Sequence, residues 1–181
     1  MDMLHAYQIL ETAANDMTKR TQFSADDPVV FPTVSGDKTH VEAELLPVTD
    51  VSHDGEQPIA ARVQEGQSNG YWVNWFKRDD EITIPYVAER KGTYTVTMDC
   101  FSDAQASKPN HFTVTGDKIE ETSADVSSTD INGADVTVTF DITITEAGAG
   151  TITLKAGEAN GPSIDKFVIT PKTFEGPYRI D

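Results

Sequence analysis

Hydrophobic and polar residues alternate along most of the chain from residue 39 onward. The clearest stretch is DVTVTFDITI at 135–144, in which Val, Phe and Ile alternate with Thr and Asp. Successive side chains of a strand point to opposite faces, so this pattern predicts a strand with one core face and one solvated face. The same pattern predicts strands at 39–46, 59–64, 71–77, 80–85, 93–101, 111–116, 135–144, 149–155 and 163–170.

Turns rich in Gly, Asn and Asp separate these short segments, as in an antiparallel all-β domain. Their number and spacing predict a jelly-roll β-sandwich of two antiparallel sheets. We therefore expect one sandwich domain at 39–172, followed by a C-terminal tail at 173–181.

The first part of the chain has a different period. Apolar residues recur at steps of three and four along residues 1–20, which predicts an amphipathic N-terminal helix, and residues 21–38 contain two prolines and read as an extended linker. We expect residues 1–38 either to pack on the sandwich or to be the tail of a preceding catalytic domain. The helical stripe consists of Met3, Ala6, Tyr7, Leu10, Ala14 and Met17.

Charge narrows the choice of partners. Thirty acidic residues against fourteen basic ones give a formal net charge of -16, which disfavours nucleic acid and anionic membrane surfaces. The sequence contains no apolar run long enough to span a membrane and no recognisable signal peptide. The second absence leaves the location open, because a domain taken from a longer secreted protein has the same pattern.

Candidate catalytic residues form no known constellation. The single Cys100 shares the apolar face of its strand with Tyr94, Val96 and Met98, so we expect a buried residue rather than a reactive thiol. The four histidines show no metal-binding spacing, and no Ser lies in a G-x-S-x-G motif. The acidic residues fall mostly in turns or on solvated faces, so a hydrolase or lyase domain is the weaker alternative.

Three carboxylates suggest a metal site. Glu42 and Glu44 share one face of the first strand, and Asp165 lies in the last strand. First and last strands of jelly rolls often lie side by side, and an oxygen-rich set of this kind suits Ca²⁺ and does not suit Zn²⁺. The alternative is a solvated pair of glutamates on an exposed strand face.

Four segments, in order, resemble the family 6 and family 35 carbohydrate-binding modules, which are jelly-roll modules of secreted polysaccharide-degrading enzymes. The resemblance covers residues 39–171 and implies a structural Ca²⁺ held by Glu42, Glu44 and Asp165, with backbone oxygens from around residues 68–71. The segments are VEAELL, SNGYWVNWFKRDDEITIP, KGTYTVTMDCFS and AGAGTITLKAGEANGPSIDKFVIT.

The resemblance also implies a sugar-binding cleft at the loop end of the sandwich. Aromatic rings there stack on sugar rings while amides and carboxylates bind hydroxyl groups. Trp75 and Asn160 match the family's aromatic and Asn positions, and Trp72 and Tyr71 are further candidates. The chain departs from the family pattern at Asn74, where a Gly is usual, and at 120–135, which lacks a second Trp.

Together these features predict a non-catalytic, extracellular and monomeric module that targets a covalently linked glycoside hydrolase to a polysaccharide. The negative charge favours a neutral glycan. Agar-type polysaccharides, xylan, galactan and host glycans all stay open as the ligand. A structural or adhesion module without sugar binding is the alternative, because the fold alone does not fix the function.

Overall fold

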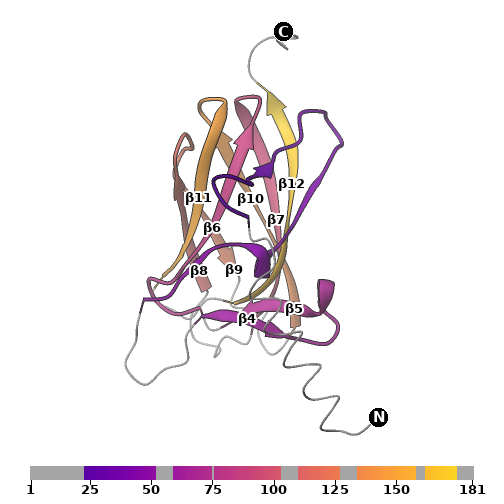
Figure 1. Ribbon diagram of the computed structural model, residues 1–181, viewed down its shortest axis with the longest axis vertical. Coiled ribbons are helices and arrows are strands. Elements are labelled where there is room, and N and C mark those ends of the chain that lie inside the picture. The colour runs from indigo at the N-terminus through magenta and orange to yellow at the C-terminus, as the bar shows by residue number, and fades with distance from the viewer. Residues whose placement is uncertain are drawn as a thin grey trace, which may run out of the picture.

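Two sheets packed face to face make up the protein in a computed structural model that describes residues 23–51, 59–74, 76–102, 110–126, 134–157 and 162–174 (Figure 1). The predicted N-terminal helix at 1–20 lies outside the described residues. None of the helices among the described residues has the length and apolar character that crossing a membrane requires.

Sheet A carries its strands in the order β1-β6-β11-β8-β9, with β3 also paired to β6. All of these pairs are antiparallel except β1 with β6. The strands are β1 (Val29–Val30), β3 (Val48–Thr49), β6 (Glu81–Ala88), β8 (Asn110–Gly116), β9 (Thr122–Val126) and β11 (Gly148–Ala156).

Sheet B carries its strands in the order β10-β7-β12-β5-β4, with β2 also paired to β12, and every pair is antiparallel. The short strands β4 and β5 lie at the lower end of the sandwich in Figure 1. The strands are β2 (Thr39–Glu42), β4 (Ala60–Val63), β5 (Tyr71–Asn74), β7 (Gly92–Ser102), β10 (Ala134–Ile144) and β12 (Ser163–Phe174). The predicted all-β jelly-roll sandwich is thus confirmed.

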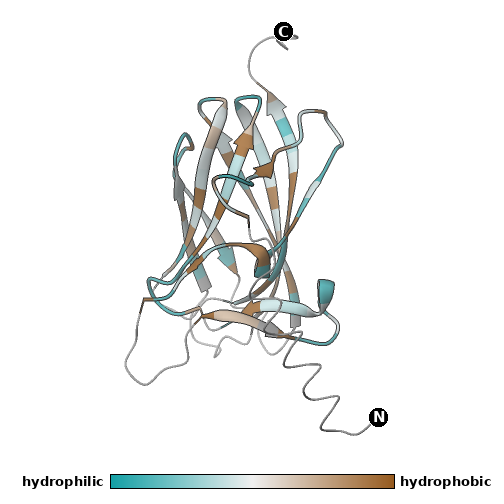
Figure 2. Ribbon diagram, in the orientation of Figure 1, coloured by the Kyte–Doolittle hydropathy of each residue, from teal (hydrophilic) through white to brown (hydrophobic). Residues whose placement is uncertain are grey.

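The core lies between the two sheets and follows the period-two pattern. In β10, Val138, Phe140, Ile142 and Ile144 are buried, and they alternate with partly or fully exposed Thr and Asp. Figure 2 shows the same alternation of hydrophobic and hydrophilic residues along the strands. Cys100 belongs to this core, as its position on the apolar face predicted.

The expected linker contributes to the same core. Val29 and Val30 form β1 on the edge of sheet A, and Phe31 follows as a fully buried residue. The Phe31 ring lies 4.9 Å from that of Tyr86 and 5.1 Å from that of Tyr94, measured between centroids. Residues 29–31 are therefore packed as part of the sandwich.

Several strand boundaries differ from the prediction. The predicted strand 39–46 ends at Glu42, where a 3-10 helix, η1 (Ala43–Leu45), turns the chain away from β12. The predicted strand 71–77 ends at Asn74 in the structure, and a turn at 78–79 precedes β6. β9 was not predicted at all, since Ala124 and Val126 alone supply its buried face.

Candidate functional site

Asp165 lies where β12 changes its neighbour at one edge. Ile164 pairs with Val73 of β5, and from Lys166 onward β12 pairs with β2, beginning with Glu42. Along the other edge, the register against β7 shifts between Ile164 and Lys166, which makes Asp165 the extra residue of a β-bulge. Because of the bulge, Ile164 and Phe167 can both face the core while Asp165 between them does not.

The three predicted metal ligands gather beside this bulge. We call Glu42, Glu44 and Asp165 the acidic corner. Glu42 ends β2, Glu44 lies in η1, and both carboxylates are close enough to Asp165 to raise its pKa by charge repulsion. The predicted adjacency of the first and last strands is confirmed by the pairing of β2 with β12, whereas a metal site made by the three residues stays a prediction.

The turn before β5 supplies hydrogen bonds to the two glutamates of the acidic corner. Ser68 Oγ donates to Glu42 Oε2 at 2.5 Å, and Asn69 Nδ2 donates to Glu44 Oε1 at 3.0 Å. The backbone amide of Ser68 lowers the pKa of Asp165. Asn69 has a left-handed backbone (φ 56°), which Asn tolerates better than most residues. The local conformation of the turn thus aims its donors at the acidic corner.

Asp165 is a buried carboxylate with a perturbed pKa. It is 4% exposed, and its Oδ1 has no hydrogen-bond partner among the described residues. Burial, followed by the charges of Glu42 and Glu44, raises the pKa of Asp165 from 3.8 to about 6, although Lys166 and the Ser68 N–H act in the opposite direction. Burying a carboxylate oxygen that has no hydrogen-bond donor costs free energy, and a cation bound to that oxygen would reduce the cost.

The acidic corner fits Ca²⁺ in donor chemistry, since carboxylate oxygens are hard ligands. In the positions described, however, no three His, Cys, Asp or Glu side chains form a group that could hold a metal ion. Hydrogen bonds from Ser68 and Asn69 hold the glutamates instead. A metal would have to draw these carboxylates away from their present donors.

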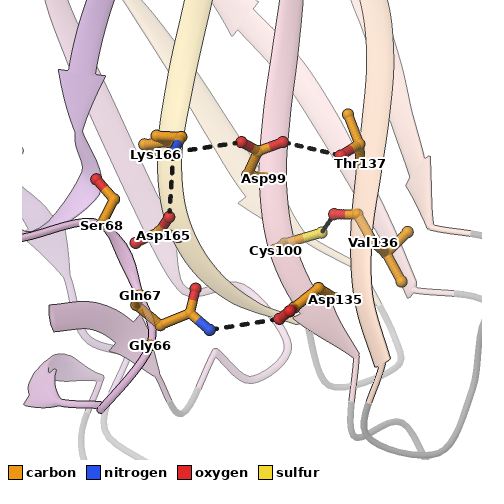
Figure 3. Close-up of a pocket in the computed structure, with 10 residues that line it drawn as sticks. All are labelled: Gly66, Gln67, Ser68, Asp99, Cys100, Asp135, Val136, Thr137, Asp165 and Lys166. Atoms are coloured by element: carbon orange, nitrogen blue, oxygen red, sulfur yellow. Dashed lines mark hydrogen bonds and ion pairs between the residues drawn. The ribbon is translucent and has the colours of Figure 1, made fainter. Parts of the chain in front are cut away.

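A pocket of about 250 Å³ opens next to the acidic corner (Figure 3). Lys166 lies between two carboxylates of its wall, with Nζ 3.7 Å from Asp99 Oδ2 and 3.8 Å from Asp165 Oδ2. Thr137 Oγ1 donates to the other oxygen of Asp99 at 2.9 Å. The pocket is lined by Gly66, Gln67, Ser68, Asp99, Cys100, Asp135, Val136, Thr137, Asp165 and Lys166.

Lys166 and Asp99 were not among the predicted site residues. They belong to β12 and β7, far apart in the chain, and only the pairing of these strands places Lys166 opposite Asp99. A basic residue directly after the predicted ligand Asp165 was the one available signal, but strict alternation would have sent the two side chains to opposite faces.

The predicted sugar-binding residues divide into two pairs. Trp75 and Asn160 lie outside the described residues. Trp72 is 9% exposed and packs on Phe101, with ring centroids 5.3 Å apart, while Tyr71 is half-buried at the start of β5. Trp72 is not part of the main core cluster, to which the adjacent Val73 belongs. Sugar contact by any of the four stays a prediction.

One His–Asp pair resembles part of a catalytic triad. His111 Nδ1 lies 2.5 Å from Asp125 Oδ1, and Ser123 Oγ donates to Asp125 Oδ2 at 3.4 Å. In a triad the serine contacts the second ring nitrogen of the histidine, whereas Ser123 contacts the aspartate. The His111 and Asp125 side chains are also 47% and 61% exposed, so water competes for their interaction. This pair gives the hydrolase alternative no support.

No family model matches the sequence, and no curated protein matches it either. Solved structures share its fold. A family 35 carbohydrate-binding module from Clostridium thermocellum aligns with a TM-score of 0.58 and 20% identity, over 72% of this chain and 97% of that module. The C-terminal family 6 module of a marine laminarinase from Zobellia galactanivorans aligns with a TM-score of 0.55 and 18% identity, over 74% of this chain and 99% of that module.

The fold also occurs as part of a larger enzyme. An exo-β-1,3-galactanase from Phanerochaete chrysosporium, solved with β-1,3-galactotriose, aligns with a TM-score of 0.57 and 19% identity. The match covers 76% of this chain but only 30% of the galactanase. The similarity to family 6 and family 35 modules that the four sequence segments suggested is therefore confirmed at the level of the fold.

Proposed function

We propose that this protein is a non-catalytic carbohydrate-binding module that holds an attached glycan-degrading enzyme on its polysaccharide. The observation that carries the proposal is the extent of the structural match. The described sandwich aligns with nearly the whole of separate carbohydrate-binding modules, whereas it aligns with less than a third of the galactanase. A chain that matches a whole binding module is expected to bind and tether. Tethering raises the local concentration of the substrate around the attached enzyme.

The ligand class follows from charge. With a formal net charge of -16, the protein repels polyanionic glycans unless a cation intervenes, so we propose a neutral polysaccharide. Trp75 stacks on a sugar ring, and Asn160 binds its hydroxyl groups, with Trp72 and Tyr71 as secondary contacts. The setting is extracellular, and the module acts as a monomer linked to a catalytic domain.

Calcium is the structural part of the proposal. Glu42, Glu44 and Asp165 would hold the ion, with backbone oxygens from residues 68–71 completing its shell. The supporting observation is the buried Oδ1 of Asp165, which has no hydrogen-bond partner among the described residues. The ion would supply positive charge beside Asp165, which the charges of Glu42 and Glu44 repel.

A glycan array with and without calcium tests the whole proposal. We expect retention on a neutral glycan, which affinity electrophoresis then quantifies. Trp75→Ala should abolish the retention at an unchanged melting temperature, and Asn160→Ala should weaken it. Release of reducing sugar by the isolated protein would favour a hydrolase instead. Folded protein without retention on any glycan would favour a structural or adhesion module.

The structural or adhesion alternative has one specific observation in its favour. Trp72 is nearly buried against Phe101, so this aromatic ring is used in packing. If Trp75 is packed in the same way, Trp75→Ala should lower the melting temperature, and the loop end would have no aromatic platform for sugar.

A further inference from the structure

Asp80 is a fully buried carboxylate between β5 and β6. Its Oδ2 accepts a hydrogen bond from the backbone N–H of Lys77 at 2.8 Å, and its Oδ1 accepts one from the N–H of Val51 at 2.9 Å. Burying a carboxylate is costly unless donors satisfy both oxygens. Here the donors come from two segments far apart in the chain, so Asp80 joins the turn before β6 to the segment that follows β3 (Val48–Thr49).

The backbone of the same turn is tied to the end of β11. The N–H of Asp79 donates to the carbonyl oxygen of Ala156 at 2.9 Å, and the N–H of Ala156 donates to the carbonyl oxygen of Asp80 at 2.8 Å. One residue further, the N–H of Gly157 donates to the carbonyl oxygen of His111 at 2.8 Å. The end of β11 is thus fixed both to the Asp80 turn and to β8.

A second connection links β5 with the start of β12. Ser163 Oγ donates to Asn74 Oδ1 at 2.8 Å, and Ser163 is 3% exposed. This side-chain bond adds to the strand pairing of Val73 with Ile164. A Gly at position 74, which is usual in the modules that the sequence resembles, has no side chain to accept this bond. The connection is therefore a feature of this chain.

The two connections enclose the proposed sugar contacts along the chain. Trp75 lies in the segment between Asn74 and Asp80. Asn160 lies in the segment between the end of β11 and the start of β12. The Asp80 turn joins one end of the first segment to one end of the second, and the bond between Asn74 and Ser163 joins the remaining two ends.

We propose that Asp80, together with the hydrogen bond between Asn74 and Ser163, positions the sugar-binding residues by fixing the separation of the segments that carry Trp75 and Asn160. A ring stacked on a sugar and an amide bonded to its hydroxyl groups must reach the same ligand at once. Segments that are already held together lose less entropy when they bind. This inference rests on the proposed function and adds residues that act behind the sugar contacts.

Asp80→Asn tests the proposal with little change of shape. One of the two terminal atoms of Asn is a donor, so the N–H of either Lys77 or Val51 loses its acceptor. We expect glycan affinity to fall roughly tenfold, because two freed side chains must then be ordered on binding. Affinity electrophoresis in gels that contain agarose, xylan or galactan measures the change. Ser163→Ala, which removes the second connection, should also weaken retention.

Tyr86→Phe is the matched control for lost stability. It removes the buried hydrogen bond from the Tyr86 hydroxyl group to the carbonyl oxygen of Asp117, which is 2.8 Å long. Tyr86 lies near the opposite end of β6 from Asp80, opposite Gly150 of β11. We expect this variant to melt at a lower temperature, as Asp80→Asn should, but to keep the glycan retention of the wild type.

The indole N–H signals in a proton–nitrogen NMR spectrum give a readout without sugar. The chain has two tryptophans, so Trp75→Phe assigns both signals. In Asp80→Asn and in Ser163→Ala we expect the Trp75 signal to shift or broaden while the Trp72 signal stays in place. In Tyr86→Phe both signals should stay.

The outcomes separate this inference from the binding function. If the wild type is retained and Asp80→Asn weakens retention no more than Tyr86→Phe does, the positioning role is overturned and the binding function stands. If the wild type binds no glycan, in these gels or on the array, both are overturned. If Asp80→Asn does not fold, Ser163→Ala decides, and wild-type retention with an unmoved Trp75 signal would overturn the role.

Discussion

Ile164 and Phe167 both point into the core, although they are three residues apart in one strand. Each is fully buried, and strict alternation would have placed one of them in solvent. The extra residue of the bulge, Asp165, absorbs the difference. Core packing on both sides of the bulge thus fixes the carboxylate in its buried position, whatever its electrostatic cost.

That cost predicts how the stability of the metal-free protein depends on pH. Burial and the neighbouring glutamates raise the pKa of Asp165 to about 6 in the folded state, above its ordinary value of 3.8. Between these values the folded protein holds a proton that the unfolded chain has lost, so stability falls as pH rises from about 4 to above 6. The upper limit of the loss is about 3 kcal/mol for a shift of roughly two units.

Urea denaturation of the metal-free protein between pH 4 and pH 7.5 measures this dependence. Asp165→Asn replaces the titrating group with a neutral one of the same shape, and we expect it to remove most of the decline. Asp141→Asn is the control, since the Asp141 pKa is lowered, chiefly by Lys172, so Asp141 titrates mainly below this pH range and the decline should persist in this variant. Equal slopes for the wild type and Asp165→Asn would show that the carboxylate is already solvated or paired.

The stabilisation that calcium provides should increase with pH, whereas the stability of the metal-free protein decreases. At neutral pH, free calcium at 100 times its dissociation constant would stabilise the fold by about 2.7 kcal/mol, and chelation by EDTA would remove that amount. Below pH 6 protons compete for Asp165, so the difference between calcium and EDTA should shrink. Asp165→Ala should abolish it at every pH. Thermal melts with and without EDTA measure this, and an EDTA effect that survives Asp165→Ala would place the metal elsewhere.

Much of the fold could be predicted from the sequence, because alternating hydrophobic and polar residues indicate which face of a strand is buried. The strands with long alternating runs, such as β7 and β10, were located to within a residue or two. β1 and β3 have two residues each, which is too short for any periodicity to appear. η1 was missed because Val41, Ala43 and Leu45 imitate a continuing strand.

The site was predictable only in part, because the sequence shows its residues but not the contacts that folding brings to them. The acidic residues were visible in the sequence, and the expectation that first and last strands meet brought them together. The bulge was also encoded, since Ile164, Phe167 and Ile169 cannot all face one side of a regular strand. The partners of the carboxylates were not encoded locally, because Ser68 and Lys166 reach them through turn geometry and strand register.

Trp72 gives a prediction that separates packing from sugar binding. The ring is nearly buried and packs on Phe101 outside the main core, so Trp72→Ala should destabilise the protein by about 3 kcal/mol. Trp72→Phe should cost less, since an aromatic contact with Phe101 is kept. Chemical denaturation measures both, and Val63→Ala, at a residue that is 66% exposed, is a control with little expected effect. A Trp72→Ala variant of wild-type stability that no longer binds glycan would assign the ring to the ligand.

Gly92 marks how far the sandwich extends toward the C-terminus. It begins β7 with φ 144° and pairs with Phe174 of β12 and Ile144 of β10. A Cβ atom at this position would lie 2.2 Å from the carbonyl oxygen of Thr173, which belongs to a paired strand and cannot easily move. The Phe174 ring is itself held by Arg90, whose guanidinium lies 3.9 Å from the ring centroid.

Gly92→Ala should therefore force β7 and the end of β12 apart and destabilise the protein by more than about 2 kcal/mol. Gly36→Ala is the matched control, because Gly36 also has a positive φ (96°) but faces open space, so only backbone strain of about 1 kcal/mol is expected. Urea denaturation of both variants measures the difference. If both cost the same, residues 173–174 contribute nothing to the sandwich and the functional module ends where the predicted tail begins. A larger cost for Gly92→Ala would mean that any shortened form of the module must keep β12 through Phe174.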